Sequence, residues 1–318
     1  MKTKLLALTL LIAAISACSE THHLPDDGFV DVPGGRVAFR VVGEGNLTPV
    51  LWIHGGPGGS SCGAVANVLD IARNRPVILY DQLGSGYSDR IIDLEQYASL
   101  PRFVEEIVAI RDELGLKELH IVGHSWGNAV ALEYLLTKKP SGIRSVVFAS
   151  PFFGTERWIA DANELLEELP VAAQAVVAAA IESGDFASSE FKAVNDLFMK
   201  NFGTRTAHEL VNRDACKKKP SGDSGLYEYM WGPTEFVATG TLIDYNRIDR
   251  LPELDLPVLF VTGQYDEARP ETVKYFQGLV KGSKIEVLPD AGHAVYVDQQ
   301  ALFNATLNEF FAEVESQR

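Results

Sequence analysis

Gly123-His124-Ser125-Trp126-Gly127 is the stretch of this 318-residue chain that decides its fold. The apolar run Leu119-His120-Ile121-Val122 before it has the length of a buried strand, and residues 128–139 after it have the pattern of a helix. Glycines on both sides of the serine let the strand and the helix pass closely, so that a sharp turn exposes the serine hydroxyl at the end of the sheet. The pattern therefore predicts a nucleophilic serine at position 125.

A serine nucleophile needs a base and an acid, and candidates for both follow later predicted strands. Asp266 comes just after the apolar segment 257–263, and His293 comes just after the segment 284–288. One helix fits between these two strands, so both loops leave the same edge of a parallel sheet and can converge on the serine. His293 would take the hydroxyl proton, and Asp266 would orient the imidazole. The alternative is a surface histidine and a turn or capping aspartate.

A glycine-rich loop, His54-Gly55-Gly56-Pro57-Gly58-Gly59, follows the apolar strand 50–53. Glycine leaves a backbone N–H uncovered and tolerates the dihedral angles that aim it at a developing oxyanion. We expect the N–H groups of Gly56 and Trp126 to form an oxyanion hole. The competing interpretation is a phosphate-binding loop, but the spacing matches neither the P-loop nor the dinucleotide fingerprint.

The order of elements predicts an α/β fold with a mostly parallel central sheet of about eight strands. Strand-like and helix-like segments alternate up to residue 154 and again from residue 251, whereas residues 155–250 read as helix after helix. We therefore expect a core formed by residues 29–154 and 251–318, with a helical cap inserted at 155–250. The alanine-rich run 171–181 is interpreted as a cap helix, with a membrane-dipping helix as the alternative.

Six short motifs together resemble the prolyl aminopeptidases (proline iminopeptidases), a family with the α/β-hydrolase fold. They are HGGPG at 54–58, DQLGSGYS at 81–88, GHSWG at 123–127, WGPTEF at 231–236, GTL at 240–242 and YDE at 265–267. The resemblance runs from about residue 30 to residue 311. It implies a cap-bearing core, a catalytic triad of Ser125, Asp266 and His293, and two glutamates, Glu235 and Glu267, that hold the free amino terminus of the substrate.

Two carboxylates from different segments are a physically sensible way to recognise an amino terminus. Glu267 adjoins the acid loop and Glu235 leads back from the cap, so together they would position an ammonium group through charge-assisted hydrogen bonds. The repulsion between them is relieved when a cation binds. In a chain with 43 acidic residues, the alternative is a pair of solvated surface glutamates.

The chain departs from the family pattern in the helix after the serine and in the cap. Asn128 stands where the family commonly has a glycine, and the segment 198–205 resembles its family counterpart only loosely. Aromatic residues of the second half of the cap are expected to line the substrate pocket. They are Tyr227, Tyr229, Trp231 and Phe236. Such a pocket could accept proline, other small apolar residues or short amides.

These observations predict a serine aminopeptidase that releases amino-terminal proline, or small apolar residues, from short peptides and aminoacyl amides. No metal or cofactor is implied. One alternative is an esterase, amidase or lactonase that uses the same residues, and another is a catalytically idle binding lipoprotein. Asp81, at the end of a strand, is interpreted as support for a turn, because a hydrolase with an aspartate nucleophile, such as an epoxide hydrolase, would have aspartate at position 125.

The first residues resemble a bacterial lipoprotein signal. Lys2 and Lys4 precede an apolar run at 5–17 that is too short to span a membrane in the mature protein, and Cys18 follows a small residue. We expect residues 1–17 to be a signal peptide, Cys18 to carry lipid, and residues 18–28 to be a tether at the bacterial cell envelope. Ordinary secretory cleavage, with release of the protein, is the alternative.

Charge and cysteine content complete the sequence-based expectations. A formal net charge of −15 argues against nucleic-acid binding and against electrostatic docking on anionic lipid, so membrane attachment is expected through the lipid alone. Export would place Cys62 and Cys216 in an oxidising compartment. A disulfide between them would join the cap to the core beside the active site; the alternative is two unpaired thiols.

Overall fold

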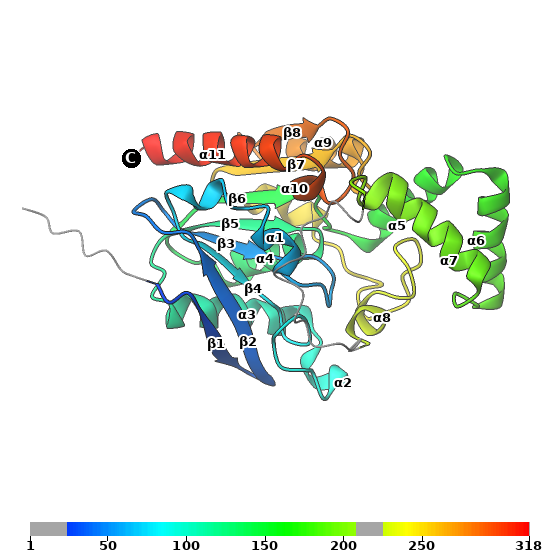
Figure 1. The fold of residues 1–318 in the computed structure, drawn as a ribbon, viewed down its shortest axis with the longest axis horizontal. Coiled ribbons are helices and arrows are strands. Elements are labelled where there is room, and N and C mark those ends of the chain that lie inside the picture. The colour runs from blue at the N-terminus through cyan, green and yellow to red at the C-terminus, as the bar shows by residue number, and fades with distance from the viewer. Residues whose placement is uncertain (1–23, 208–224, 318) are drawn as a thin grey trace, which may run out of the picture.

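The computed structural model of the protein describes residues 24–207 and 225–317 (Figure 1). Three sequence-based predictions lie outside these residues: the signal peptide at 1–17, the lipidated Cys18, and Cys216. In the part of the chain that is described, no helix is both long and apolar enough to cross a membrane.

The described residues contain one eight-stranded sheet whose strand order is β1-β2-β4-β3-β5-β6-β7-β8. Only the pairs β1·β2 and β2·β4 are antiparallel, and all other neighbours are parallel. The strands are β1 (Asp27–Val32), β2 (Gly35–Val42), β3 (Val50–Ile53), β4 (Val77–Tyr80), β5 (Leu119–His124), β6 (Ile143–Ala149), β7 (Val258–Gly263) and β8 (Lys284–Leu288). The prediction of a mostly parallel sheet of about eight strands is confirmed.

Helices cover both faces of the sheet, which explains why its central strands are continuous apolar runs. One face packs on α3 (Leu100–Glu113), α4 (Trp126–Lys138) and α9 (Pro270–Leu279), and the other on α1 (Cys62–Val65), η1 (Ile71–Arg73), α10 (Val295–Asp298) and α11 (Gln300–Ser316). All six residues of β5 are buried between these layers. The short helix α2 (Leu94–Tyr97) lies in the loop before α3.

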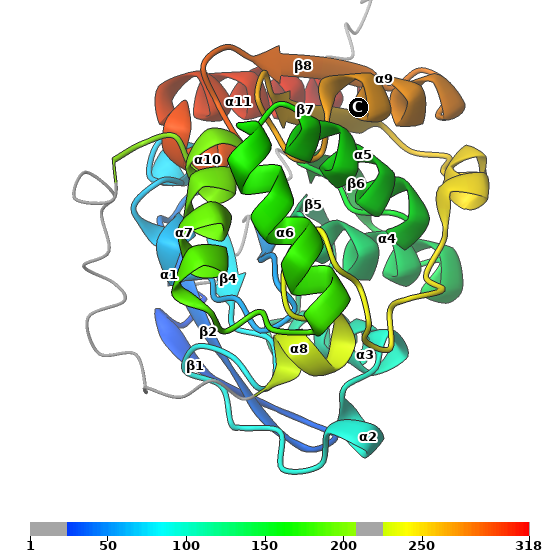
Figure 2. The same cartoon turned by 90° about the vertical axis from the view of Figure 1, so that its right-hand side faces the viewer.

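A set of helices inserted between β6 and β7 extends from one end of the sheet (Figure 1). They are α5 (Thr155–Glu167), α6 (Val171–Ser183), α7 (Ser189–Phe198), η2 (Met199–Gly203) and α8 (Leu226–Met230), and η5 (Ile248–Glu253) returns the chain to the core. Figure 2 shows α6 and α7 in front of the ends of the strands. These helices have an apolar cluster of their own, to which α6 contributes Ala173, Val177 and Ala180.

The turn from β5 into α4 depends on the absence of a side chain at Gly127. A Cβ atom there would overlap the carbonyl oxygen of Ile53 at the end of β3. The helix can therefore start directly above the neighbouring strand, and Ser125 is held in a conformation with φ 53° and ψ −124°. Such a backbone conformation is costly for a residue with a side chain, and it persists because packed elements on both sides impose it.

We predict that Gly127→Ala destabilises the protein by several kcal/mol, because the added methyl group would meet backbone atoms that cannot move aside. The matched control is Gly278→Ala in α9, where an added Cβ atom meets nothing within 4 Å. This control substitution should stabilise the helix by up to about 1 kcal/mol. Urea unfolding of both variants measures the difference, and equal stabilities would contradict the packing argument.

Candidate active site

Ser125 lies at the carboxyl end of β5, and its side chain lines a small cavity beneath the inserted helices. Gly56 and Trp126 line the same cavity, so both predicted oxyanion-hole residues are next to the predicted nucleophile. The free volume of this cavity is about 10 Å³, which is about the space of one water molecule.

Asp266 and His293 are brought together by the adjacent strands β7 and β8, as their positions in the sequence predict. The Nδ1–H of His293 donates to Oδ1 of Asp266 over 2.8 Å. Asp266 is only 1% exposed and also accepts hydrogen bonds from the hydroxyl of Thr262 and from the backbone N–H of Ala268. Burial opposes its charge, but the neighbouring imidazole, the Ser150 hydroxyl and the Ala268 N–H lower the pKa of Asp266 below its usual value.

Glu267 and Glu235 converge on the far side of the imidazole. Nε2 of His293 lies 3.6 Å from Oε1 of Glu267, which is 2% exposed, while Glu235 lines the Ser125 cavity and accepts a 2.6 Å hydrogen bond from the Tyr227 hydroxyl. Burial and the charge of Glu235 raise the pKa of Glu267 well above its usual value. Burial disfavours the charged imidazolium, but Glu267 and Asp266 outweigh it and raise the pKa of His293 to about 9.

Oε2 of Glu267 is buried and has no hydrogen-bond partner among the described residues. An unpartnered buried carboxylate oxygen carries a desolvation penalty, which is removed when a donor reaches it. A cationic donor would relieve both this penalty and the repulsion from Glu235. The empty site is therefore electrostatically complementary to an ammonium group.

Gln82 connects the glycine-rich loop to Trp126, and sequence analysis did not single it out. Its backbone N–H donates to Nε2 of His54 over 2.9 Å, and its side-chain amide donates to the carbonyl oxygen of His54 over 2.8 Å. The indole N–H of Trp126 donates to the amide oxygen of Gln82 over 2.8 Å. The loops that carry Gly56 and Trp126 are thus held at a constant separation. The motif at 81–88 contained Gln82, but only the fold shows its partners.

A second support that sequence analysis missed holds the backbone of His293. The carbonyl oxygen of His293 accepts a 2.8 Å hydrogen bond from the Ser150 hydroxyl and a 3.0 Å hydrogen bond from Nε2 of His124. Burial lowers the pKa of His124 to about 3, so the ring is neutral with its proton on Nε2. Ser150 is fully buried at φ 50°, and its hydroxyl also contributes to the lowered pKa of Asp266.

Asn128, the departure from the family pattern, lies under the turn at Ser125. Its side-chain amide donates to the carbonyl oxygen of Ala149 over 2.8 Å, and the backbone N–H of Ser125 donates to the same oxygen over 3.1 Å. The Oδ1 atom of Asn128 packs against Gly123 and has no hydrogen-bond partner among the described residues. Asn128 therefore joins α4 to the end of β6 beneath Ser125 and does not line the cavity.

The walls of the Ser125 cavity differ in part from those expected. Tyr227 and Trp231 line it, but Phe236 and Tyr229 do not, and the prediction for these two residues was wrong. Phe236 packs on Phe191 and Phe198 inside the inserted helices and is only 3% exposed. The remaining walls come from residues at the start of the insertion and at the end of its second half. They are Phe152, Trp158 and Leu242.

Asp81 and Cys62 both lie next to the glycine-rich loop. Asp81 accepts hydrogen bonds from the N–H and the hydroxyl of Ser61, at 2.7 and 3.0 Å, and from the N–H of Tyr87 at 2.8 Å. It therefore supports a turn, in agreement with the sequence-based interpretation. Cys62 is disulfide-bonded. Because Cys216 is outside the described residues, the pairing of these two cysteines remains a prediction. Within residues 24–207 and 225–317, no group of three or more potential ligand side chains could hold a metal ion.

Comparison with known proteins agrees with this geometry. Residues 48–300 match the model of the alpha/beta hydrolase fold family. A proline iminopeptidase from Heyndrickxia coagulans is 40% identical over 291 residues, which are 91% of this chain and 99% of that protein. A second, from Lactobacillus crispatus, is 31% identical over 278 residues, or 86% of this chain and 93% of that protein. The crystal structure of proline iminopeptidase from Mycobacterium smegmatis superposes with a TM-score of 0.83 at 26% identity, covering 92% and 99% of the two chains.

The sheet, the turn at Ser125 and the family match define this protein as an α/β hydrolase. Its similarity over nearly the whole chain to the curated relatives places it more narrowly. The chain belongs to the proline iminopeptidase family.

We predict that Ser150→Ala lowers kcat by about tenfold or more on any substrate of the enzyme while KM changes little, because the carbonyl oxygen of His293 would lose one of the two side-chain donors that hold it. Ser150→Gly relaxes the strained backbone but also lacks the hydroxyl, so it should show the same loss. Steady-state kinetics of both variants, with circular dichroism to verify folding, separates the loss of the hydroxyl from the change in backbone strain. Full activity of the glycine variant would show that the hydroxyl has no positioning role.

Proposed function

We propose that this hydrolase is a serine aminopeptidase that releases amino-terminal proline, or another small apolar residue, from short peptides and aminoacyl amides. The observation that carries the proposal is the pair Glu235 and Glu267 beside the imidazole of His293. A free amino terminus fits this arrangement, since two carboxylates can accept its protons from different directions. An ester or an acylated amine would leave both carboxylates without a cationic partner.

The proposed reaction gives each of these groups one role. The substrate ammonium binds between the two glutamates, which places the first carbonyl carbon near the Ser125 hydroxyl. Ser125 attacks as Nε2 of His293 takes its proton, and the N–H groups of Gly56 and Trp126 stabilise the oxyanion. His293 then protonates the leaving amine. Water then attacks the acyl-enzyme while His293 takes a proton from it. His293 returns the proton to Ser125, and the free amino acid is released.

The proposed preference for a small first residue rests on the cavity walls. Trp158, Trp231 and Phe152 pack edge to face, with ring centroids 5.5 to 6.4 Å apart. Rings locked together in this way resist a large side chain more than a compact one. The ring of proline is compact, apolar and rigid, so it loses little conformational entropy on entering such a space.

Export and lipid attachment at Cys18 belong to this proposal as well. They are supported by the basic and apolar leader before Cys18. The same enzyme would then act on short peptides at the bacterial cell envelope. Radiolabelled palmitate, or mass spectrometry of the mature amino terminus, would distinguish a lipidated Cys18 from ordinary secretory cleavage.

We predict that prolyl and alanyl arylamides are hydrolysed, whereas their N-acetylated forms are not. Glu235→Gln should raise KM for the free-amine substrates by about tenfold or more, because a charge-assisted hydrogen bond is removed. The matched control is Glu228→Gln on α8, an exposed glutamate near the same segment. Ser125→Ala should abolish turnover. Faster hydrolysis of a short-chain aryl ester, or indifference to acetylation, would instead favour an esterase.

We predict that Glu267→Gln shifts the ascending limb of the kcat/KM profile to lower pH by roughly one unit. The reason is that Glu267 stabilises the imidazolium form, so its removal lowers the pKa of His293 from about 9 toward the ordinary value. The base form of His293 then appears at lower pH. Profiles of the wild type, Glu267→Gln and Glu228→Gln with one substrate measure this, and an unshifted limb would exclude the proposed charge coupling.

A further inference from the structure

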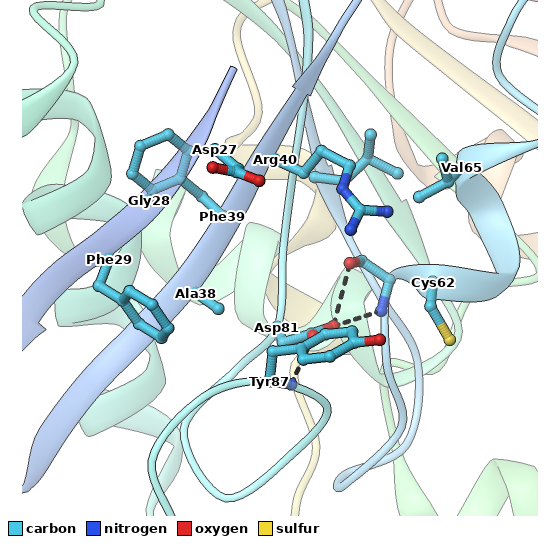
Figure 3. Close-up of a pocket in the computed structure, with 12 residues that line it drawn as sticks. Asp27, Gly28, Phe29, Ala38, Phe39, Arg40, Cys62, Val65, Asp81 and Tyr87 are labelled. Atoms are coloured by element: carbon cyan, nitrogen blue, oxygen red, sulfur yellow. Dashed lines mark hydrogen bonds between the residues drawn. The ribbon is translucent and has the colours of Figure 1, made fainter. Parts of the chain in front are cut away.

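A second cavity lies between the β1–β2 hairpin and α1, outside the site that contains Ser125 (Figure 3). Its volume is about 300 Å³, at the lower end of the range for small-molecule sites. The apolar and aromatic part of its wall comes from segments far apart in the sequence. These residues are Phe29, Ala38, Phe39, Val65, Leu79 and Tyr87.

Two charged side chains of opposite sign share one side of this cavity. Asp27 on β1 and Arg40 on β2 are directly opposite each other in the antiparallel register, so their side chains leave the same face of the sheet. Within the described chain, neither side chain makes a hydrogen bond or an ion pair. Figure 3 shows the guanidinium of Arg40 directed into the cavity, between Val65 and Tyr87.

The third charged group, Asp81, is already satisfied. Its two oxygens accept the hydrogen bonds from Ser61 and Tyr87 described above, and it is only 3% exposed. The charges that remain for a ligand are therefore one guanidinium and one carboxylate. A simple anion would bind Arg40 but face Asp27, and a simple cation would bind Asp27 but face Arg40.

We propose that this cavity binds a free α-amino acid with an apolar side chain. The α-carboxylate pairs with Arg40, the α-ammonium pairs with Asp27, and the side chain packs on the apolar part of the wall. Only one carbon atom separates the two charged groups of an α-amino acid, which suits a cross-strand pair whose Cβ atoms are about 5 Å apart. A zwitterion has no net charge, so the strongly acidic chain does not repel it.

The position of the cavity links it to the hydrolytic site. Ser61 and Cys62 line it and directly follow the glycine-rich loop that carries Gly56. A ligand carboxylate on Arg40 would lie beside Ser61, whose hydroxyl donates to Asp81. The ligand class is also the one that the proposed aminopeptidase would release. That last point rests on the proposed function, whereas the site itself does not.

Calorimetric titration with L-leucine tests the site in a Ser125→Ala/Glu235→Gln background, in which the proposed amine site is impaired and no turnover occurs. N-acetyl-L-leucine lacks the cation and L-leucinamide lacks the anion. We expect saturable binding of one L-leucine per chain, and binding of each probe weakened by about tenfold. Because this experiment measures no activity, its outcome is independent of whether the protein proves to be an aminopeptidase.

Variants of the two charged residues locate the binding. Arg40→Gln and Asp27→Asn should each weaken L-leucine binding by about tenfold, and Arg40→Lys should weaken it less. The matched controls are Asp31→Asn, on the same strand as Asp27, and Arg73→Gln on η1; neither residue lines the cavity. Absence of binding, equal binding of N-acetyl-L-leucine, or affinity unchanged by Arg40→Gln and Asp27→Asn would each overturn the proposal.

Discussion

The buried hydrogen bond between Asp266 and His293 is the interaction on which the arrangement of the site at the ends of β7 and β8 depends. A carboxylate that is 1% exposed stays ionised only when several donors and a positive neighbour compensate for the lost water. Those donors come from the end of β7 and from the backbone that follows it, and the imidazole comes from the loop after β8. The pair therefore requires the parallel strands to be adjacent and in register, as the sheet provides.

Three carboxylates surround this one imidazole, and their effects differ because their surroundings differ. Asp266 has its charge satisfied by donors, whereas Glu267 has an oxygen without a partner in the described part of the chain and a raised pKa. Negative charge around the ring holds His293 in its protonated form up to about pH 9. A cation bound by Glu235 and Glu267 would neutralise part of that charge and return the imidazole toward its ordinary basicity. Under the proposed function, binding of an amine would therefore also restore the imidazole as a base.

The fold and the main site residues could be predicted because their signals are local. The serine turn, the glycine-rich loop and the strand ends before Asp266 and His293 each depend on a few consecutive residues and on the rule that parallel strands end at one edge. The supports behind them could not be predicted in this way. Ser150 and Gln82 act on residues that are 143 and 28 positions away in the chain, so only the folded structure makes them neighbours. The wrong placement of Phe236 has the same origin, since an aromatic residue at that position suits a cavity wall as well as a helical core.

The sequence by itself determined the class of fold, and it pointed to a candidate nucleophile, its candidate partners and two extra glutamates, because hydrophobic periodicity and short motifs record local backbone requirements directly. Only the tertiary structure decided how charge is distributed around His293, which aromatic rings close the Ser125 cavity, and that Asp27 and Arg40 face a common space without pairing with each other or with another residue that the structure describes. These properties depend on burial and on distances between segments remote in the chain. Desolvation energies depend on burial and Coulomb energies on distance, so both are set only when the chain has folded.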